Sequence, residues 1–188
     1  IRMTPPALNF FRQLSHVVTR LECYSNDVFT SVGTGFFFQV KNTDESHVPI
    51  LVTNRHVVEN SDFVRFRINE KDANNNSIAD KFYTLEVLSS LFKNHPNQNI
   101  DLCAAAIGSL LKKYLEEDDV KLLYTSIHPK IIPTKDEFAK LNAFEDVIMI
   151  GYPNGLWDSH NNMPIFRKGI TATHPALDYN GSKEFCWF

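Results

Sequence analysis

Short apolar runs recur along the first half of the chain and predict β-strands. The runs are rich in β-branched and aromatic residues, and polar or glycine-containing segments separate them. They cover residues 15–24, 33–40, 49–58, 63–68, 82–88 and 101–108. In the run at 63–68, Arg65 and Arg67 alternate with apolar residues, as in a strand with one buried and one solvated face. About six short strands at regular spacing favour an antiparallel barrel or sandwich over βαβ units.

Helical patterns occur at the N-terminus and in the middle of the chain. Residues 1–14 are expected to form an N-terminal extension or a short helix with its apolar side chains on one side. Residues 110–119 predict a helical turn. Residues 133–141 contain a capping box, in which Thr134 caps the helix and Glu137 follows three residues later. We expect this middle part to connect two lobes.

Strand-like sequence resumes after the connection, at residues 146–153, 166–174 and 183–188. This pattern predicts a second β-rich lobe that is shorter than the first. The chain stops within the last of these predicted strands, and its first residue is Ile rather than Met, which indicates a trimmed or excised chain.

Composition and charge are those of an ordinary soluble globular protein. The 188 residues can bury a sizeable core, and 43% of them are hydrophobic and 22% charged. A net charge of −3 with scattered Lys and Arg gives no general attraction for nucleic acid or for an anionic membrane. The longest apolar stretches are too short to cross a bilayer, and the first residues lack the apolar region of a signal peptide. We therefore expect neither nucleic acid nor membrane as a partner.

The cysteines argue against a disulfide framework. Cys23, Cys103 and Cys186 are odd in number and form no Cys-x-x-Cys pair, which favours a reducing compartment and hence a cytoplasmic location. The chain contains neither a recognisable structural zinc motif nor a His-Glu-x-x-His helix, so no metal site is predicted.

Two residues at the ends of apolar runs are candidates for chemistry. His56 follows the apolar stretch that begins at residue 49, and Asp101 precedes another such stretch. Taken singly, His56 could be a hydrogen-bonded structural residue, and Asp101 could form a local turn with Asn99. An acid at the start of an apolar segment is nevertheless costly unless a partner is present.

Considered together, the two residues suggest a general base with its orienting carboxylate. A carboxylate on one imidazole nitrogen fixes the tautomer and stabilises the imidazolium, which leaves the other nitrogen to take a proton from a nucleophile. His56 precedes Asp101 by 45 residues. The chymotrypsin triad has the same order and about the same spacing, so this match is a comparison with a known system.

Four segments then resemble those of trypsin/chymotrypsin-like serine peptidases, especially the bacterial, disulfide-poor trypsin-like peptidase domains. They are GTGFFF (33–38), LVTNRHVV (51–58), IDLCAAAI (100–107) and VIMIGYPNGLWDSHNNMPIFRKGITAT (147–173). The first resembles the start of a strand of that family, the second the strand that ends in the catalytic His, and the third the strand that begins with the catalytic Asp. The fourth resembles the opening hairpin of the second barrel. The resemblance spans residues 15–188.

The resemblance implies an all-β fold of two antiparallel, chymotrypsin-like β-barrels, the second incomplete in this chain. The first barrel would span 15–110 and contain His56 and Asp101. A connection would follow at 111–144, and the truncated second barrel at 145–188. His56 would be the general base and Asp101 its orienting partner, acting on a peptide or protein substrate without a cofactor. Thr53 and Asn54 would make the tight turn at the end of the strand that precedes His56. The oligomeric state is left open.

The nucleophile of that family is a Ser in a Gly-x-Ser-Gly type turn, about 90 residues after the Asp. This spacing would place it just beyond Phe188, so we expect a fragment that lacks the C-terminal segment. Ser182 is in a predicted hairpin turn and Ser159 in a polar loop, so neither is a convincing substitute. Cys186 lies in a bulky apolar run without glycines to expose its sulfur, and we expect a core cysteine there.

Three hypotheses follow. The first is a serine endopeptidase domain whose nucleophile is absent from this chain. The second is a catalytically inactive, protease-like binding or sensing module. The third is a non-peptidase β-barrel in which His56 and Asp101 are unrelated, and a separation beyond about 3.5 Å would favour it.

Overall fold

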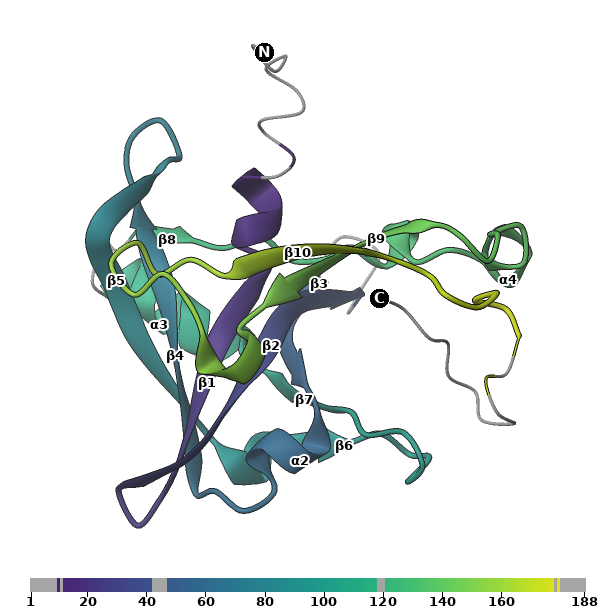
Figure 1. Ribbon diagram of the computed structural model, residues 1–188. Coiled ribbons are helices and arrows are strands. Elements are labelled where there is room, and N and C mark those ends of the chain that lie inside the picture. Colours follow the sequence, from purple (N-terminus) through teal and green to yellow (C-terminus); the bar gives the residue numbers. More distant parts are fainter. Residues whose placement is uncertain (1–9, 11, 42–46, 118–120, 178, 180–188) are drawn as a thin grey trace.

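The computed structural model describes residues 10, 12–41, 47–117, 121–177 and 179 (Figure 1). In this part of the chain the predicted all-β class is confirmed, because the strands form two antiparallel sheets and the helices are short. Residues 10 and 12–15 are helical. The rest of the predicted N-terminal extension, and the predicted strand at 183–188, lie outside the described residues.

The larger sheet has eight strands in the order β5-β4-β1-β2-β3-β7-β6, with β8 beside β4. Their bounds are β1 (Val18–Ser25), β2 (Val28–Lys41), β3 (His47–Thr53), β4 (Phe63–Lys71), β5 (Ser77–Leu88), β6 (Lys93–Asn94), β7 (Cys103–Ala106) and β8 (Leu122–Leu123). Consecutive strands β1 to β3 pair as antiparallel neighbours, and β4 returns to pair with β1.

The core lies on the concave side of this sheet. Its fully buried side chains come from almost every strand, among them Leu21, Phe37, Leu51, Phe66, Leu85 and Ala105. Because these residues form one cluster, the sheet must curve around them, as Figure 1 shows. The alternation predicted at 63–68 is confirmed, since Phe66 and Ile68 are buried while Arg65 and Arg67 are only partly covered on the outer face.

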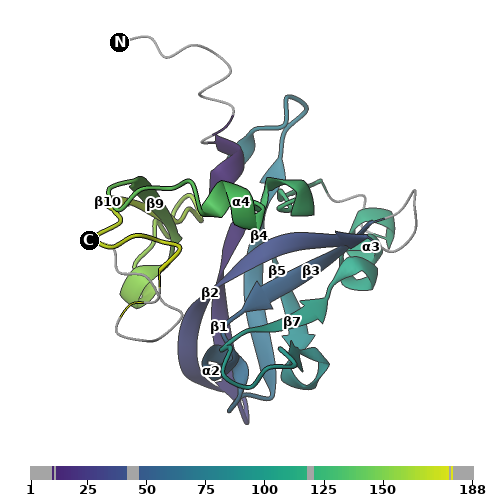
Figure 2. The ribbon, with the colours of Figure 1, turned by 90° about the vertical axis from the view of Figure 1, so that its right-hand side faces the viewer.

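The smaller sheet is a hairpin of β9 (Asp146–Gly151) and β10 (Ile165–Ile170). It lies to one side of the larger sheet (Figure 2). The loop between its strands folds back onto the larger sheet, where the guanidinium groups of Arg20 and Arg67 lie 5.1 and 5.3 Å from the ring centroid of Trp157. Asn162 of the same loop donates a 2.6 Å hydrogen bond to Asn69.

The helical segments are α2 (Arg55–Val58), α3 (Gly108–Glu117) and α4 (Lys135–Phe138), with 3-10 turns at Ser89–Leu91, Pro129–Ile131 and Pro153–Gly155. The capping box predicted for Thr134 and Glu137 is present at the start of α4. The strand in the apolar run at 49–58 ends where a turn was expected, at Thr53 and Asn54. The strand ends at Thr53, Asn54 takes the N-cap position, and the next four residues form the single turn of α2.

Candidate active site

The antiparallel register of β3 and β7 brings the two predicted site residues together. Thr53, the last residue of β3, pairs with Cys103, the first residue of β7. The segments that follow β3 and precede β7 therefore meet at the same end of the sheet. His56 lies three residues beyond Thr53, and Asp101 lies two residues before Cys103. The distance of 45 residues along the chain thus becomes a direct contact in the fold.

His56 and Asp101 are joined by two hydrogen bonds. Nδ1 of the imidazole is hydrogen-bonded to Oδ2 of the carboxylate, and the backbone N–H of His56 donates to Oδ1 at 3.1 Å. The side-chain amide of Asn54 donates to the backbone carbonyl of Asp101 at 2.8 Å. These contacts hold the imidazole ring and the backbone of α2 against the segment that contains Asp101. The separation expected for two unrelated residues is not observed.

The position of α2 is set by the backbone of Val57 and by small residues beneath it. The carbonyl of Val57 accepts hydrogen bonds from Sγ of Cys23 and from Oγ of Ser31, both at 3.1 Å. A Cβ atom at Gly33 would lie 2.5 Å from Cγ1 of Val57, so only glycine allows this close approach. The side chain of Val58 is buried. These contacts fix the helical turn that carries His56.

The Gly-Thr-Gly stretch of β2 also orders the end of β3 and the end of β9. The carbonyl of Thr34 accepts a 2.9 Å hydrogen bond from the buried hydroxyl of Thr53. The Thr34 hydroxyl accepts a 3.0 Å hydrogen bond from the backbone N–H of Tyr152, which follows β9. One residue therefore links the end of the strand before the site to the hairpin of the smaller sheet.

The surroundings of Asp101 favour its charged form. Hydrogen bonds from His56 lower the pKa of the Asp101 carboxyl, and the positive charge of Arg55 acts in the same direction. The guanidinium of Arg55 is held by a 3.3 Å hydrogen bond to the carbonyl of Gln98. An ionised carboxylate on Nδ1 is the arrangement that stabilises an imidazolium when the ring accepts a proton on its other nitrogen.

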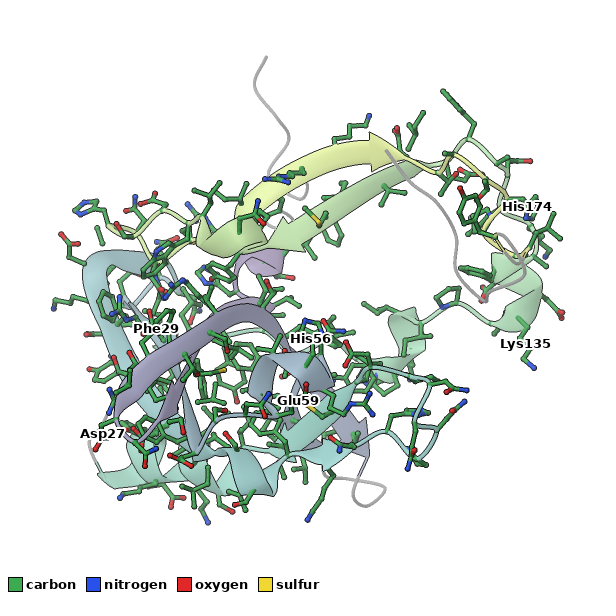
Figure 3. All side chains as sticks on the ribbon, turned by 60° about the horizontal axis from the view of Figure 1, so that its bottom comes forward. Asp27, Phe29, His56, Glu59, Lys135 and His174 are labelled. Atoms are coloured by element: carbon green, nitrogen blue, oxygen red, sulfur yellow. The ribbon has the colours of Figure 1, made fainter. Side chains whose placement is uncertain are left out.

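The second ring nitrogen of His56 is available to a reactant. The His56 side chain is 66% exposed and that of Asp101 41%, and His56 lies at the surface on α2 (Figure 3). Within the described ranges, no hydroxyl or thiol is hydrogen-bonded to the His56 ring. The pair can therefore take a proton from a group brought to it, but that part of the chain does not supply the group.

An apolar groove of about 450 Å³ lies next to the pair, on the outer face of β2, β3 and β7. Leu102 and Cys103, which directly follow Asp101, contribute to its wall together with Phe36, Phe38, Ile50 and Val52. The Cys103 side chain is buried, and burial raises the pKa of its thiol to about 11. Cys103 is thus a protonated core thiol at neutral pH and not an activated nucleophile.

The other candidates considered from sequence do not join the pair. Ser159 is exposed in the loop between β9 and β10, and no hydrogen bond links it to His56. Ser182 and Cys186 lie outside the described residues. The neighbouring His160 lies exposed in the same loop and pairs through Nδ1 with Oδ1 of Asp80 at 2.8 Å. Sequence reasoning missed this pair because 80 positions separate its members and no apolar run ends at either.

Among the residues that the structure describes, no three His, Cys, Asp or Glu side chains are grouped so that they could hold a metal ion. No helix in the same ranges has the length and apolar character needed to cross a membrane.

No protein-family model matches the chain, and no curated protein matches it. Among solved structures, the crystal structure of Deg5 matches with a TM-score of 0.47 and 14% sequence identity. The match covers 92% of this chain and 66% of the Deg5 chain, so this chain spans slightly less than two thirds of that protein. A TM-score this low does not establish a shared fold, and the function must be argued from the site itself.

Proposed function

We propose that this chain supplies the general base and its orienting carboxylate to a serine endopeptidase, with a peptide or protein as substrate. One observation carries the proposal. The carboxylate of Asp101 is hydrogen-bonded both to Nδ1 and to the backbone N–H of His56, while the side chain that bears Nε2 remains largely exposed. The carboxylate on Nδ1 fixes the tautomer of the imidazole ring. Nε2 is left open to a reactant.

In the proposed reaction, Nε2 of His56 takes the proton of a serine hydroxyl as the serine oxygen bonds to the carbonyl carbon of the substrate. The imidazolium, stabilised by Asp101, then gives this proton to the leaving nitrogen as the peptide C–N bond breaks. A water molecule repeats the sequence. It loses a proton to His56 and attacks the acyl carbon, and the proton returns to the serine oxygen as the acyl bond breaks. Asp101 keeps its negative charge throughout.

A second function is favoured by the absence, in the described ranges, of a hydroxyl or thiol bonded to the His56 ring. A protease-like domain without a nucleophile would act as a binding or sensing module. In that case the His56–Asp101 contact would serve only to close one end of the sheet, by joining the segment after β3 to the segment before β7.

A serine-directed fluorophosphonate distinguishes the two functions. The complete natural polypeptide is incubated with the reagent, and the labelled residue is identified by mass spectrometry. The endopeptidase proposal predicts stoichiometric labelling of one serine, which His56→Ala suppresses and His160→Ala leaves unchanged. Absence of labelling in the folded, complete polypeptide would contradict the proposal and support the binding module.

A further inference from the structure

A polar cavity of about 550 Å³ lies away from His56, where three segments meet. The segments are the helical turn near the N-terminus, the loop between β4 and β5, and the stretch that follows β8. Figures 1 and 2 both show the helical turn beside the β4–β5 hairpin. A backbone hydrogen bond of 2.9 Å from Thr125 to the carbonyl of His16 joins the first segment to the third.

The wall formed by the β4–β5 loop is ordered by its own hydrogen bonds. The carboxylate of Asp72 accepts from the backbone N–H groups of Asn74 and Asn76, both at 2.8 Å, and from the side-chain amide of Asn76 at 3.2 Å. These bonds lower the pKa of the Asp72 carboxyl. Asp72 therefore orders the loop and keeps its negative charge.

Two cations, Arg12 and Lys71, line this cavity. The guanidinium of Arg12 donates one hydrogen bond to the side-chain oxygen of Asn76, which leaves its other N–H groups for a ligand. Lys71 comes from the end of β4. Among the described residues, no carboxylate forms an ion pair with either side chain. Arg12 also interacts electrostatically with the Asp72 carboxylate, so these two cations and this one anion leave a net positive charge of one at the wall.

His16 forms part of the same wall and is buried, with 7% of its surface exposed. Its Nε2 has no hydrogen-bond partner in the part of the chain that the structure describes. Burial and the charge of Arg12 lower its pKa to about 4, so the ring is neutral at pH 7. Because Nε2 is enclosed by protein, His16 is a neutral part of the wall and does not itself bind an occupant of the cavity.

From these observations we infer that the cavity binds a small organic phosphate. An arginine fork and a lysine ammonium together recognise a doubly charged phosphoryl group. The side chains of Asn74 and Asn75, which also line the cavity, can donate to further oxygen atoms of the ligand. The volume is larger than inorganic phosphate requires and lies in the range of small-molecule sites. This inference does not depend on the peptidase proposal.

The test is a titration of the complete protein with phenyl phosphate and with inorganic phosphate at constant ionic strength, followed through the ring NMR signals of His16. We expect saturable shifts with both probes, tighter binding of phenyl phosphate, and at least tenfold weaker binding in Lys71→Met. The matched control is Lys112→Met, which removes an exposed lysine of α3 that pairs with Glu116.

Three results would overturn the inference. The His16 signals could fail to move, Lys112→Met could weaken binding as much as Lys71→Met, or acetate could bind as tightly as phosphate. His56→Ala is expected to bind phosphate as the natural protein does, because His56 lies outside the cavity. Phosphate binding by this variant therefore tests the phosphate site independently of the peptidase proposal.

Discussion

Two histidine–aspartate pairs lie at the surface of this protein, and they differ in how they are supported. In both, Nδ1 of the ring contacts a carboxylate oxygen, as between His56 and Asp101 and between His160 and Asp80. Exposure does not separate them, since the histidine side chains are 66% and 65% exposed. The difference lies in the backbone around them.

His56 and Asp101 are attached to the paired ends of β3 and β7, and a second hydrogen bond joins the carboxylate to the backbone of His56. His160 lies in a loop between β9 and β10, and its contact with Asp80 of β5 consists of side chains alone. A pair held by sheet register keeps its geometry when a substrate arrives, whereas an exposed side-chain pair contributes little and is easily exchanged for water. The pair at His160 is therefore the natural control for the pair at His56.

The largest expected effect follows from changing each aspartate to asparagine. Asp101→Asn keeps the size of the side chain, but it removes the charge that stabilises the imidazolium and favours the wrong tautomer. We expect kcat/KM for peptide hydrolysis by the complete protein to fall by about 10⁴. Asp80→Asn should change kcat/KM by less than about twofold, because exposed ion pairs contribute little free energy. Equal losses of kcat/KM in Asp101→Asn and Asp80→Asn would contradict the proposed difference between the two histidine–aspartate pairs.

A methyl group beneath α2 tests whether packing fixes the position of His56. Gly33→Ala places a Cβ atom 2.5 Å from Cγ1 of Val57, so the helical turn must shift. We expect the free energy of unfolding to fall by about 1–3 kcal/mol, together with a loss of activity. The double variant Gly33→Ala/Val57→Ala should recover part of the lost stability and part of the lost activity. Denaturant titrations measure the first and peptide assays the second. No recovery would mean that this contact does not position α2.

The asparagines beside the two pairs provide a smaller comparison. Asn54 donates to the carbonyl of Asp101 at 2.8 Å, and Asn161 donates to the carboxylate of Asp158 at 2.7 Å. Asn54→Ala should lower the free energy of unfolding by about 1 kcal/mol and reduce kcat/KM. Asn161→Ala should leave kcat/KM unchanged, since it affects only the other loop. Peptide assays on both variants decide whether Asn54 orders the site.

The smallest effect concerns the titration of Asp101. Hydrogen bonds from His56 lower the pKa of this carboxyl, so His56→Ala should raise the pKa toward the ordinary aspartate value, while His160→Ala should not. A carboxylate with a lowered pKa stabilises the fold above its unfolded pKa, and this contribution is lost as pH falls through the folded pKa. Carboxyl-carbon NMR measures the shift directly. An unchanged titration in His56→Ala would contradict the contact.

The sequence predicted those features that local patterns encode. The alternation at 63–68 and the capping box at Thr134 each depend on residues a few positions apart, and both are present. The turn expected at Thr53 and Asn54 is also present, because the strand in the run at 49–58 ends at Thr53. Asn54 occupies the N-cap position of the helical turn that follows, and Val58 on that turn is buried.

Long-range contacts could be predicted only where a known system provided the spacing. The contact between His56 and Asp101 was expected from the comparison with the chymotrypsin triad, and the two side chains do meet. No local pattern indicated the pair at His160, the unpartnered nitrogen of His16 or the close approach at Gly33. These features arise when strands distant in sequence become neighbours, and the periodicity of a single strand does not encode them.

We expect His56 to act as a general base and not only as a structural residue. The most direct test is peptide hydrolysis by the complete natural polypeptide carrying His56→Ala, compared with the same polypeptide carrying His160→Ala. The account predicts that His56→Ala lowers kcat by a factor on the order of 10⁴–10⁶ with the fold retained, whereas His160→Ala behaves as the natural protein. Full activity in a folded His56→Ala variant would contradict it.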